Sequence, residues 1–264
     1  MTALLRENAA TPGRLGFGVY LVPGFPDWDT SLAAVRAAVA GGADFVEFPI
    51  LLDTEFSAST GGVVAEALAK AGPDSLDPRS PRLRDWLAVA PVRVGVVYRS
   101  AWPSVDRWRA GDEILSGCAG LLCEHDIRPF PEYAVRARRR GLALVPALRV
   151  SAGPVTGEER DMLESGDGFV YLALSSETGR AGTVDSGLGR RIDDIRGIRP
   201  GLPVYTAFGI RNPDDVAAVA RQGADGFIVG SHALTVLGDG GPPAFERWFA
   251  GMAAARSQPT RVRT

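Results

Sequence analysis

Two apolar runs, Thr206-Ala207-Phe208-Gly209-Ile210 and Phe227-Ile228-Val229-Gly230-Ser231-His232, lie near the end of this chain of 264 residues. Each run has the composition of a β-strand, breaks at a glycine and leads towards a helical segment. Backbone N–H groups at such a turn, and at a helix N-terminus, form a binding site for an anion. Either glycine alone is explained by a tight turn, but two such turns in consecutive strand–helix units favour the phosphate site of a (β/α)8 barrel.

The rest of the chain alternates short apolar runs with helical patterns. We predict strands over residues 15–22, 44–52, 92–98, 119–123, 142–148, 169–174, 202–206 and 224–229. We predict helices over residues 30–40, 63–71, 82–89, 104–115, 130–140, 156–164, 187–198, 214–222 and 242–255. This alternation predicts an α/β TIM barrel with a parallel sheet. An open doubly wound sheet is the alternative, but no G-x-G-x-x-G follows its first strand.

We expect a single domain over residues 1–256, with a short helix near its N-terminus and a disordered tail over 257–264. The formal net charge of −2 gives no reason to expect nucleic acid or an acidic membrane as a partner. No apolar run approaches the roughly 20 residues that a membrane span needs, and the N-terminus does not resemble a secretory signal. We therefore expect a cytoplasmic protein in which Cys118 and Cys123 are reduced core residues.

The scarcity of lysine and histidine limits the chemistry. Lys70 is the only lysine, and it falls in a helical pattern and not at a strand end, which argues against a Schiff base. His125 and His232 are the only histidines, too few for a His-rich metal site. We expect no metal and no cofactor, and a mechanism based on carboxylates.

Glu47 is the strongest catalytic candidate. It is the one charged residue of its predicted strand, with Phe45, Val46, Phe48 and Ile50 around it. A carboxyl group in apolar surroundings is disfavoured in its charged form and can act as an acid or base near neutral pH. An outward-facing glutamate paired with an arginine of a covering helix is the alternative.

Other polar residues lie within or at the end of predicted strands. Glu124-His125-Asp126 ends the fourth strand, and adjacent side chains point oppositely, so at most two of them face the barrel mouth. These residues could act in catalysis or could cap the loop, and the sequence leaves both roles as alternatives. Tyr20 and Tyr171 lie within strands, where they either line a pocket or fill the barrel.

Several segments together resemble the alpha subunit of tryptophan synthase, from Phe17 to Leu237. They are Gly41-Gly42-Ala43-Asp44-Phe45-Val46-Glu47, Phe169-Val170-Tyr171-Leu172, Thr178-Gly179, Ala207-Phe208-Gly209-Ile210 and Gly230-Ser231. The resemblance implies a (β/α)8 barrel that cleaves indole-3-glycerol phosphate to indole and glyceraldehyde 3-phosphate. That retro-aldol reaction needs neither a metal nor a Schiff base.

The resemblance also implies roles for individual residues. Glu47 matches the family's catalytic glutamate, which moves protons on the indole carbon and the glycerol hydroxyl. The phosphate contacts are implied at Gly179, Gly209, Gly230 and Ser231. The indole pocket is implied at Tyr20, Leu122, Tyr171 and Phe208, and we add Thr178 and His125, which stands where the family has an aspartate.

The chain departs from the family at the second catalytic carboxylate, an aspartate that contacts the indole nitrogen. That position falls on Ala58 without a gap, or on Thr60 when aligned on the following glycine. Neither side chain can take a proton, so we expect Glu124 to supply the carboxylate, with Asp53 and Glu55 as alternatives. The same loop docks the beta subunit in the family, so the implied beta-type partner would meet an altered surface.

Three functions remain open on this basis. The first is a retained lyase, acting alone in a specialised pathway, and the surviving Glu47 and pocket aromatics favour it. The second is an enzyme for another phosphorylated or aromatic substrate, with His125 in a new acid–base set. This second function competes with the first because the loss of one acid–base group lowers a rate by about 10²–10⁴. Without a replacement for the second carboxylate, little lyase activity would remain. The third is a non-catalytic pseudo-subunit that binds a phosphate ligand.

Overall fold

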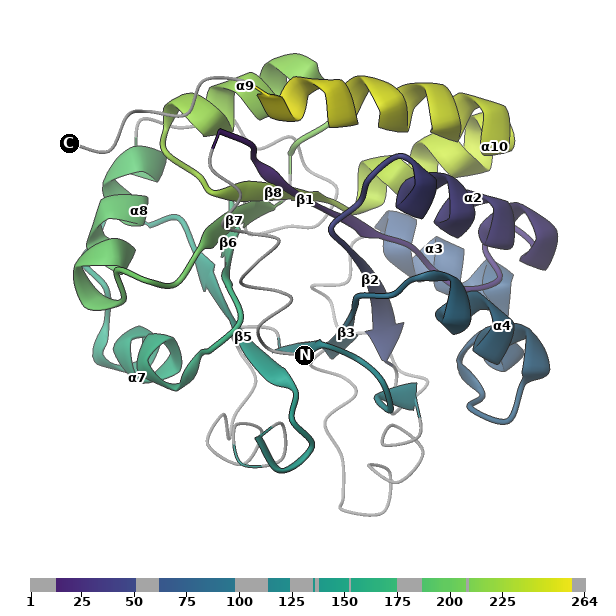
Figure 1. Ribbon diagram of the computed structural model, residues 1–264, viewed down its shortest axis with the longest axis horizontal. Coiled ribbons are helices and arrows are strands. Elements are labelled where there is room, and N and C mark those ends of the chain that lie inside the picture. The colour runs from purple at the N-terminus through teal and green to yellow at the C-terminus, as the bar shows by residue number, and fades with distance from the viewer. Residues whose placement is uncertain are drawn as a thin grey trace.

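The computed structural model describes residues 13–50, 62–97, 114–123, 135, 138–151, 153–174, 187–207 and 209–257. Eight parallel strands form a closed barrel in the order β1 to β8, with helices on its outside, so the predicted TIM barrel is confirmed (Figure 1). The strands are β1 (Gly16–Tyr20), β2 (Phe45–Ile50), β3 (Arg93–Val97), β4 (Gly120–Cys123), β5 (Ala143–Arg149), β6 (Val170–Ala173), β7 (Val204–Ala207) and β8 (Gly226–Val229). The helices are α2 (Trp28–Ala40), α3 (Gly62–Ala71), α4 (Pro81–Val89), α7 (Gly157–Ser165), α8 (Gly187–Ile198), α9 (Pro213–Arg221) and α10 (Ser231–Ala254), with 3-10 turns η1 (Pro73–Leu76) and η3 (Ala255–Ser257).

The interior of the barrel is filled by an aromatic layer below the strands' C-terminal ends. The ring centroids of Phe45 and Phe169 lie 5.1 Å apart, and that of Tyr205 lies 5.5 Å and 4.8 Å from them. Glycines of β1 make room for these rings: a Cβ on Gly16 would lie 1.8 Å from the Tyr205 hydroxyl oxygen, and one on Gly18 2.4 Å from the Phe45 ring. The layer therefore closes the barrel beneath its mouth.

The opposite faces of the same strands pack against helices. Phe17 of β1 stacks on Phe227 of β8 and on Phe249 of α10, with ring centroids 4.5 Å and 4.6 Å apart. Phe48 of β2 faces Trp86 of α4, with centroids 6.2 Å apart. Alternate residues of each strand thus divide between the interior and the helix layer.

The largest difference from the predicted elements is in α10. We predicted a helix from Pro242, but α10 begins at Ser231, directly after β8, and only Gly241 interrupts it, with φ of +65°. The first half is helical despite its glycines because its apolar face is buried, and Gly238 lies so close to Phe25 that a Cβ would meet the ring at 3.1 Å. The prediction was wrong here because Pro242 and the glycines before it are local helix breakers.

The other described elements begin and end within two residues of their predicted limits, and η1 forms between the helices predicted over 63–71 and 82–89. The helices predicted over 104–115 and 130–140 lie largely outside the described residues, as do the N-terminal helix and the tail after Ser257, which itself ends η3. Cys118 is buried, as predicted, and is a free cysteine in the structure. No helix in the described part of the chain has the length and hydropathy that a membrane crossing requires.

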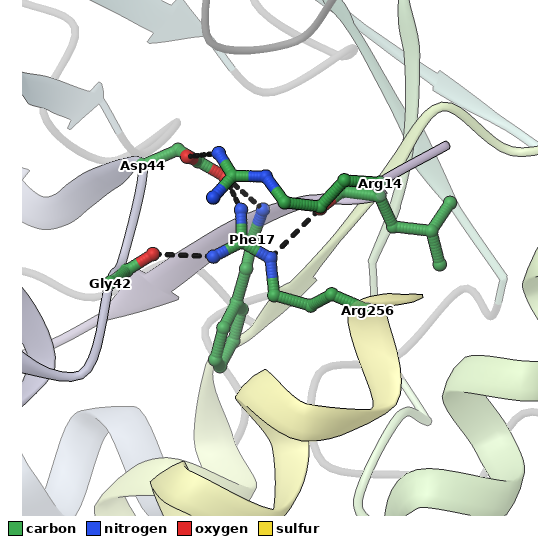
Figure 2. A network of polar contacts seen from close by, with 6 residues as sticks. Arg14, Phe17, Gly42, Asp44 and Arg256 are labelled. Atoms are coloured by element: carbon green, nitrogen blue, oxygen red, sulfur yellow. Dashed lines mark hydrogen bonds and ion pairs between the residues drawn. The ribbon is translucent and has the colours of Figure 1, made fainter. Parts of the chain in front are cut away.

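A buried ion-pair network ties the N-terminal ends of β1 and β2 to η3 (Figure 2). Asp44 Oδ1 accepts a hydrogen bond from Arg14 Nη2 at 2.7 Å, and Oδ2 accepts one from the backbone N–H of Phe17 at 2.8 Å. Arg256 donates to Asp44 Oδ2 and to the carbonyl oxygen of Gly42. Burial is the main cause that raises the pKa of Asp44 and lowers that of Arg256, so each charge depends on the other.

We expect Asp44→Ala to lower the free energy of unfolding by about 3–5 kcal/mol, because it leaves the buried Arg256 charge unpaired. Urea unfolding followed by circular dichroism measures this loss. The control is Asp77→Ala, which removes an exposed ion pair with Arg79 at 3.1 Å and is expected to change the unfolding midpoint little. Equal shifts in the two variants would contradict a structural role for the network.

Candidate active site

Glu47 lies in the middle of β2 with its side chain inside the barrel. Phe45, two residues earlier, belongs to the interior aromatic layer, whereas Phe48 faces α4, so strand alternation places Glu47 on the interior face. The residue is 2% exposed, and within the described structure its Oε1 accepts no hydrogen bond. The carboxyl group therefore stands buried under the barrel mouth with capacity to bind a reacting group.

Burial raises the pKa of Glu47 to about 8 from its ordinary value of 4.5. Desolvation, which disfavours the carboxylate, is the cause, and no charged side chain among the described residues contributes. The alternative of an outward-facing glutamate paired with an arginine is thus not what the structure has. A carboxyl group that titrates near neutral pH can both donate and accept a proton.

This pKa makes the stability of the protein depend on pH. Between pH 4.5 and about 8 the folded protein holds a proton on Glu47 that the unfolded chain has released. The free energy of unfolding therefore falls as pH rises through this window, by at most about 1.4 kcal/mol per pH unit. Glu47→Gln stays neutral, so we expect its stability relative to wild type to increase from pH 5 to pH 8. Urea unfolding at pH 5, 6.5 and 8 measures this, and a difference that does not change with pH would contradict a buried neutral acid.

Tyr20 connects Glu47 with the loop that follows β8. The two residues are register partners on the neighbouring strands β1 and β2, and Tyr20 is 4% exposed. A Cβ built on Gly230 would lie 3.6 Å from the Cβ of Tyr20. The fold thus brings together three predicted site residues that lie far apart along the chain.

The N-terminus of α10 offers backbone N–H groups at this point. Gly230 is the N-cap of α10 and provides no side-chain hydrogen bond, whereas Asn212, the N-cap of α9, accepts one from the N–H of Asp215. The first N–H groups of α10, beginning at Ser231, have no capping side chain and are suited to an anion. Gly209, after β7, has φ of +78°, a conformation that favours glycine.

Two further predicted pocket residues, Leu122 and Tyr171, lie on the interior faces of β4 and β6. Leu122 of β4 pairs in register with Val96, and Tyr171 of β6 pairs with Ala147. Leu122 is buried and Tyr171 is partly exposed. Their positions are those of residues that could contact an aromatic ligand above the interior aromatic layer.

Several predicted site residues lie outside the described residues, and their roles stay predictions. They are Glu124, His125, Thr178, Gly179 and Phe208, together with the alternatives Asp53 and Glu55 and the substituted positions Ala58 and Thr60. In the described part of the chain, no group of three or more His, Cys, Asp or Glu side chains is placed to hold a metal ion. Lys70 lies in the last turn of α3, with Nζ 5.8 Å from the ring centroid of Phe25.

Arg149 was not among the site residues predicted from the sequence. We predicted the fifth strand to end at Leu148, but β5 extends to Arg149, which pairs with Ala173 of β6. Arg149 continues the interior series of Val145 and Ala147 at a spacing of two residues. This spacing was a partial signal, because it puts Arg149 on the same strand face as Ala147, but only the barrel register shows that this face is the interior one.

The chain is similar to known proteins over most of its length. A family model described as "Tryptophan synthase alpha chain" matches residues 131–246. The tryptophan synthase alpha chain of Halorhodospira halophila is 32% identical over 244 residues, which cover 88% of this chain and 85% of that protein. This chain belongs to the tryptophan synthase alpha chain family. The alpha chain of Thermobifida fusca is 30% identical, over 88% of this chain and 87% of its own length.

Solved structures share the fold of this alpha-family chain. A structure of tryptophan synthase from Mycobacterium tuberculosis superposes with a TM-score of 0.77 at 24% identity, covering 97% of this chain and 98% of that one. A ligand-free form of the M. tuberculosis enzyme gives a TM-score of 0.76 at 25% identity, covering 97% and 99%. These structures confirm the fold, and the 32% identity to the alpha chain of Halorhodospira halophila confirms the family resemblance.

Proposed function

We propose that this member of the alpha family is a lyase that cleaves indole-3-glycerol phosphate to indole and glyceraldehyde 3-phosphate. The observation that carries the proposal is the buried carboxyl of Glu47, with an Oε1 that makes no hydrogen bond to the described residues and a pKa of about 8. It stands beside Tyr20, which contacts the position of Gly230 at the N-terminus of α10. An acid–base group and an anion site thus lie close together.

The reaction breaks the bond between ring carbon 3 of the indole and the adjacent glycerol carbon. In balance, one proton leaves the hydroxyl group on that glycerol carbon, which becomes the aldehyde, and one proton is added to ring carbon 3. Glu47 is suited to these transfers because a carboxyl group with a pKa near the working pH is effective in both directions. The N–H groups at the start of α10 would hold the phosphate, and Tyr171 and Leu122 would contact the ring.

The second carboxylate and the partner belong to the same proposal. Glu124, which follows β4, is the group that we propose to replace the family's aspartate. The segment 53–62, which docks the beta subunit in the family, differs in this chain, so we propose that the chain releases free indole on its own. The test is indole formation from indole-3-glycerol phosphate by the purified chain, with and without an added tryptophan synthase beta subunit. A rate that requires the beta subunit would contradict independent action.

A different phosphorylated or aromatic substrate is the second candidate. The observation in its favour is that Ala58 or Thr60 occupies the position of the family's second carboxylate. Turnover of another phosphate that depends on Glu47, together with no release of indole, would establish this alternative. Saturable binding of phosphate ligands without any turnover would instead identify a non-catalytic subunit.

A further inference from the structure

Arg149 brings a positive charge to the barrel mouth from the side opposite Glu47. It is the last residue of β5, on the same interior face as Ala147, and is partly exposed. In the closed barrel β5 lies three strands from β2. Its register partner is Ala173 of β6, and Ala147 and Ala173 both have small side chains.

The guanidinium group of Arg149 makes no hydrogen bond or ion pair with the described residues. Its carbonyl oxygen accepts a hydrogen bond from Arg191 Nε at 3.1 Å. It does not neutralise Glu47 either, because burial alone accounts for the raised pKa of that carboxyl. A cation at the edge of a mouth lined by apolar side chains is a site for an anion of the ligand.

The backbone of Arg149 is anchored by a buried polar network behind the strand. The side chain of Arg191 in α8 is fully buried and forms an ion pair with Glu159 of α7. Glu159 is itself held in a capping box, since its Oε2 accepts a hydrogen bond from the N–H of Thr156 at 2.8 Å. The strand end therefore holds its position when a ligand binds, which reduces the entropy lost on binding.

We propose that Arg149 binds a carboxylate on the aromatic part of the ligand, so that the preferred substrates are aromatic phosphates with a second anionic group. This inference rests on the proposed function, because it assigns the phosphate to the loops after β7 and β8, at Gly209 and Gly230. These loops are separated from Arg149 by β6, which carries Tyr171 on its interior face. A ring packed on Tyr171 would direct a substituent towards β5, and a guanidinium group binds a carboxylate through two parallel N–H groups.

The test uses indole-3-propanol phosphate, which cannot be cleaved, and its four counterparts with a carboxylate on ring carbon 4, 5, 6 or 7. Calorimetry gives the dissociation constants for wild type, Arg149→Gln and Arg149→Lys. The matched control is Arg160→Gln, which removes an exposed arginine of α7. We expect wild type to bind at least one carboxylated ligand about 10- to 100-fold more tightly than the unmodified one.

In Arg149→Gln this preference should fall to within about twofold, while the affinity for the unmodified ligand is retained. Arg149→Lys should keep part of the preference for the carboxylated ligand, and Arg160→Gln should keep all of it. Unchanged thermal unfolding of each variant would show that the fold is intact. Equal affinity of wild type for all the ligands, or a preference that survives in Arg149→Gln, would overturn the inference alone. Equal weakening of every ligand in Arg149→Gln would also overturn it, because the arginine would then bind the phosphate. If wild type binds none of the ligands, the proposed phosphate site fails as well.

Discussion

Glu47→Gln will release indole from indole-3-glycerol phosphate at least about 100-fold more slowly than the wild-type chain, if the proposed lyase activity is correct. The glutamine has nearly the same shape, but it neither donates nor accepts the proton that the reaction moves. Because Oε1 of Glu47 makes no hydrogen bond to the described residues, the substitution removes no bond there from the fold. The measurement is kcat/KM for indole formation, with the far-ultraviolet circular dichroism of both proteins recorded beside it.

Two further variants make this result specific. Glu246→Gln removes an exposed carboxylate of α10 and should leave the rate unchanged. Glu124→Gln should lose activity to a similar degree as Glu47→Gln, since we propose that it supplies the second carboxylate. A wild-type rate in Glu47→Gln would show that Glu47 takes no part in the mechanism. A wild-type rate in Glu124→Gln would indicate that Asp53 or Glu55, and not Glu124, supplies the second carboxylate.

Gly230→Asp will weaken the binding of inorganic phosphate and of glyceraldehyde 3-phosphate by at least about 100-fold. The physical reason is charge: two like charges about 4 Å apart repel by about 4 kcal/mol at the effective dielectric near a protein surface. A Cβ at Gly230 would make an ordinary contact of 3.6 Å with the Cβ of Tyr20, so the added side chain has room. Isothermal titration at low salt measures the loss, which should shrink as salt is added.

Gly230→Asn is the matched control, because asparagine has the shape of aspartate without its charge. Gly251→Asp adds the same charge to α10 away from its N-terminus, at a position where nothing lies within 4 Å of the new Cβ, and should bind phosphate normally. Gly209→Asp should act like Gly230→Asp, with an added conformational cost because φ is +78°. Wild-type affinity for phosphate in both Gly230→Asp and Gly209→Asp would contradict the phosphate hypothesis. If Gly230→Asn lost as much affinity as Gly230→Asp, the effect would be due to the size of the side chain and not to its charge.

The barrel itself could be predicted because its signals are local. Apolar runs of five to nine residues bounded by Gly, Pro and Asp occur along the chain, and helical patterns separate most of them. Local patterns also misled in one place. The glycines and prolines before Phe245 read as a break between β8 and the last helix, but burial of Leu234 and Leu237 makes the first half of α10 helical.

Arg149 shows a second limit of local patterns. A strand-ending arginine is common on exposed edges, and the interior position of this one follows only from the closed register that pairs it with Ala173. Its anchoring by Arg191 and Glu159 joins the end of β5 to two separate helices, α8 and α7. No spacing rule along the chain relates those residues to one another.

The sequence by itself determined the order of elements, the glutamate isolated in an apolar strand and the glycine turns after β7 and β8, because these depend on residues that are neighbours along the chain. Only the tertiary structure decided what those residues can do. Closure of the barrel buries Glu47 beneath the mouth and raises its pKa, and pairing of β1 with both β2 and β8 brings Tyr20 beside Glu47 and Gly230. Desolvation and proximity are properties of the packed barrel, since each depends on atoms contributed by strands far apart in the sequence.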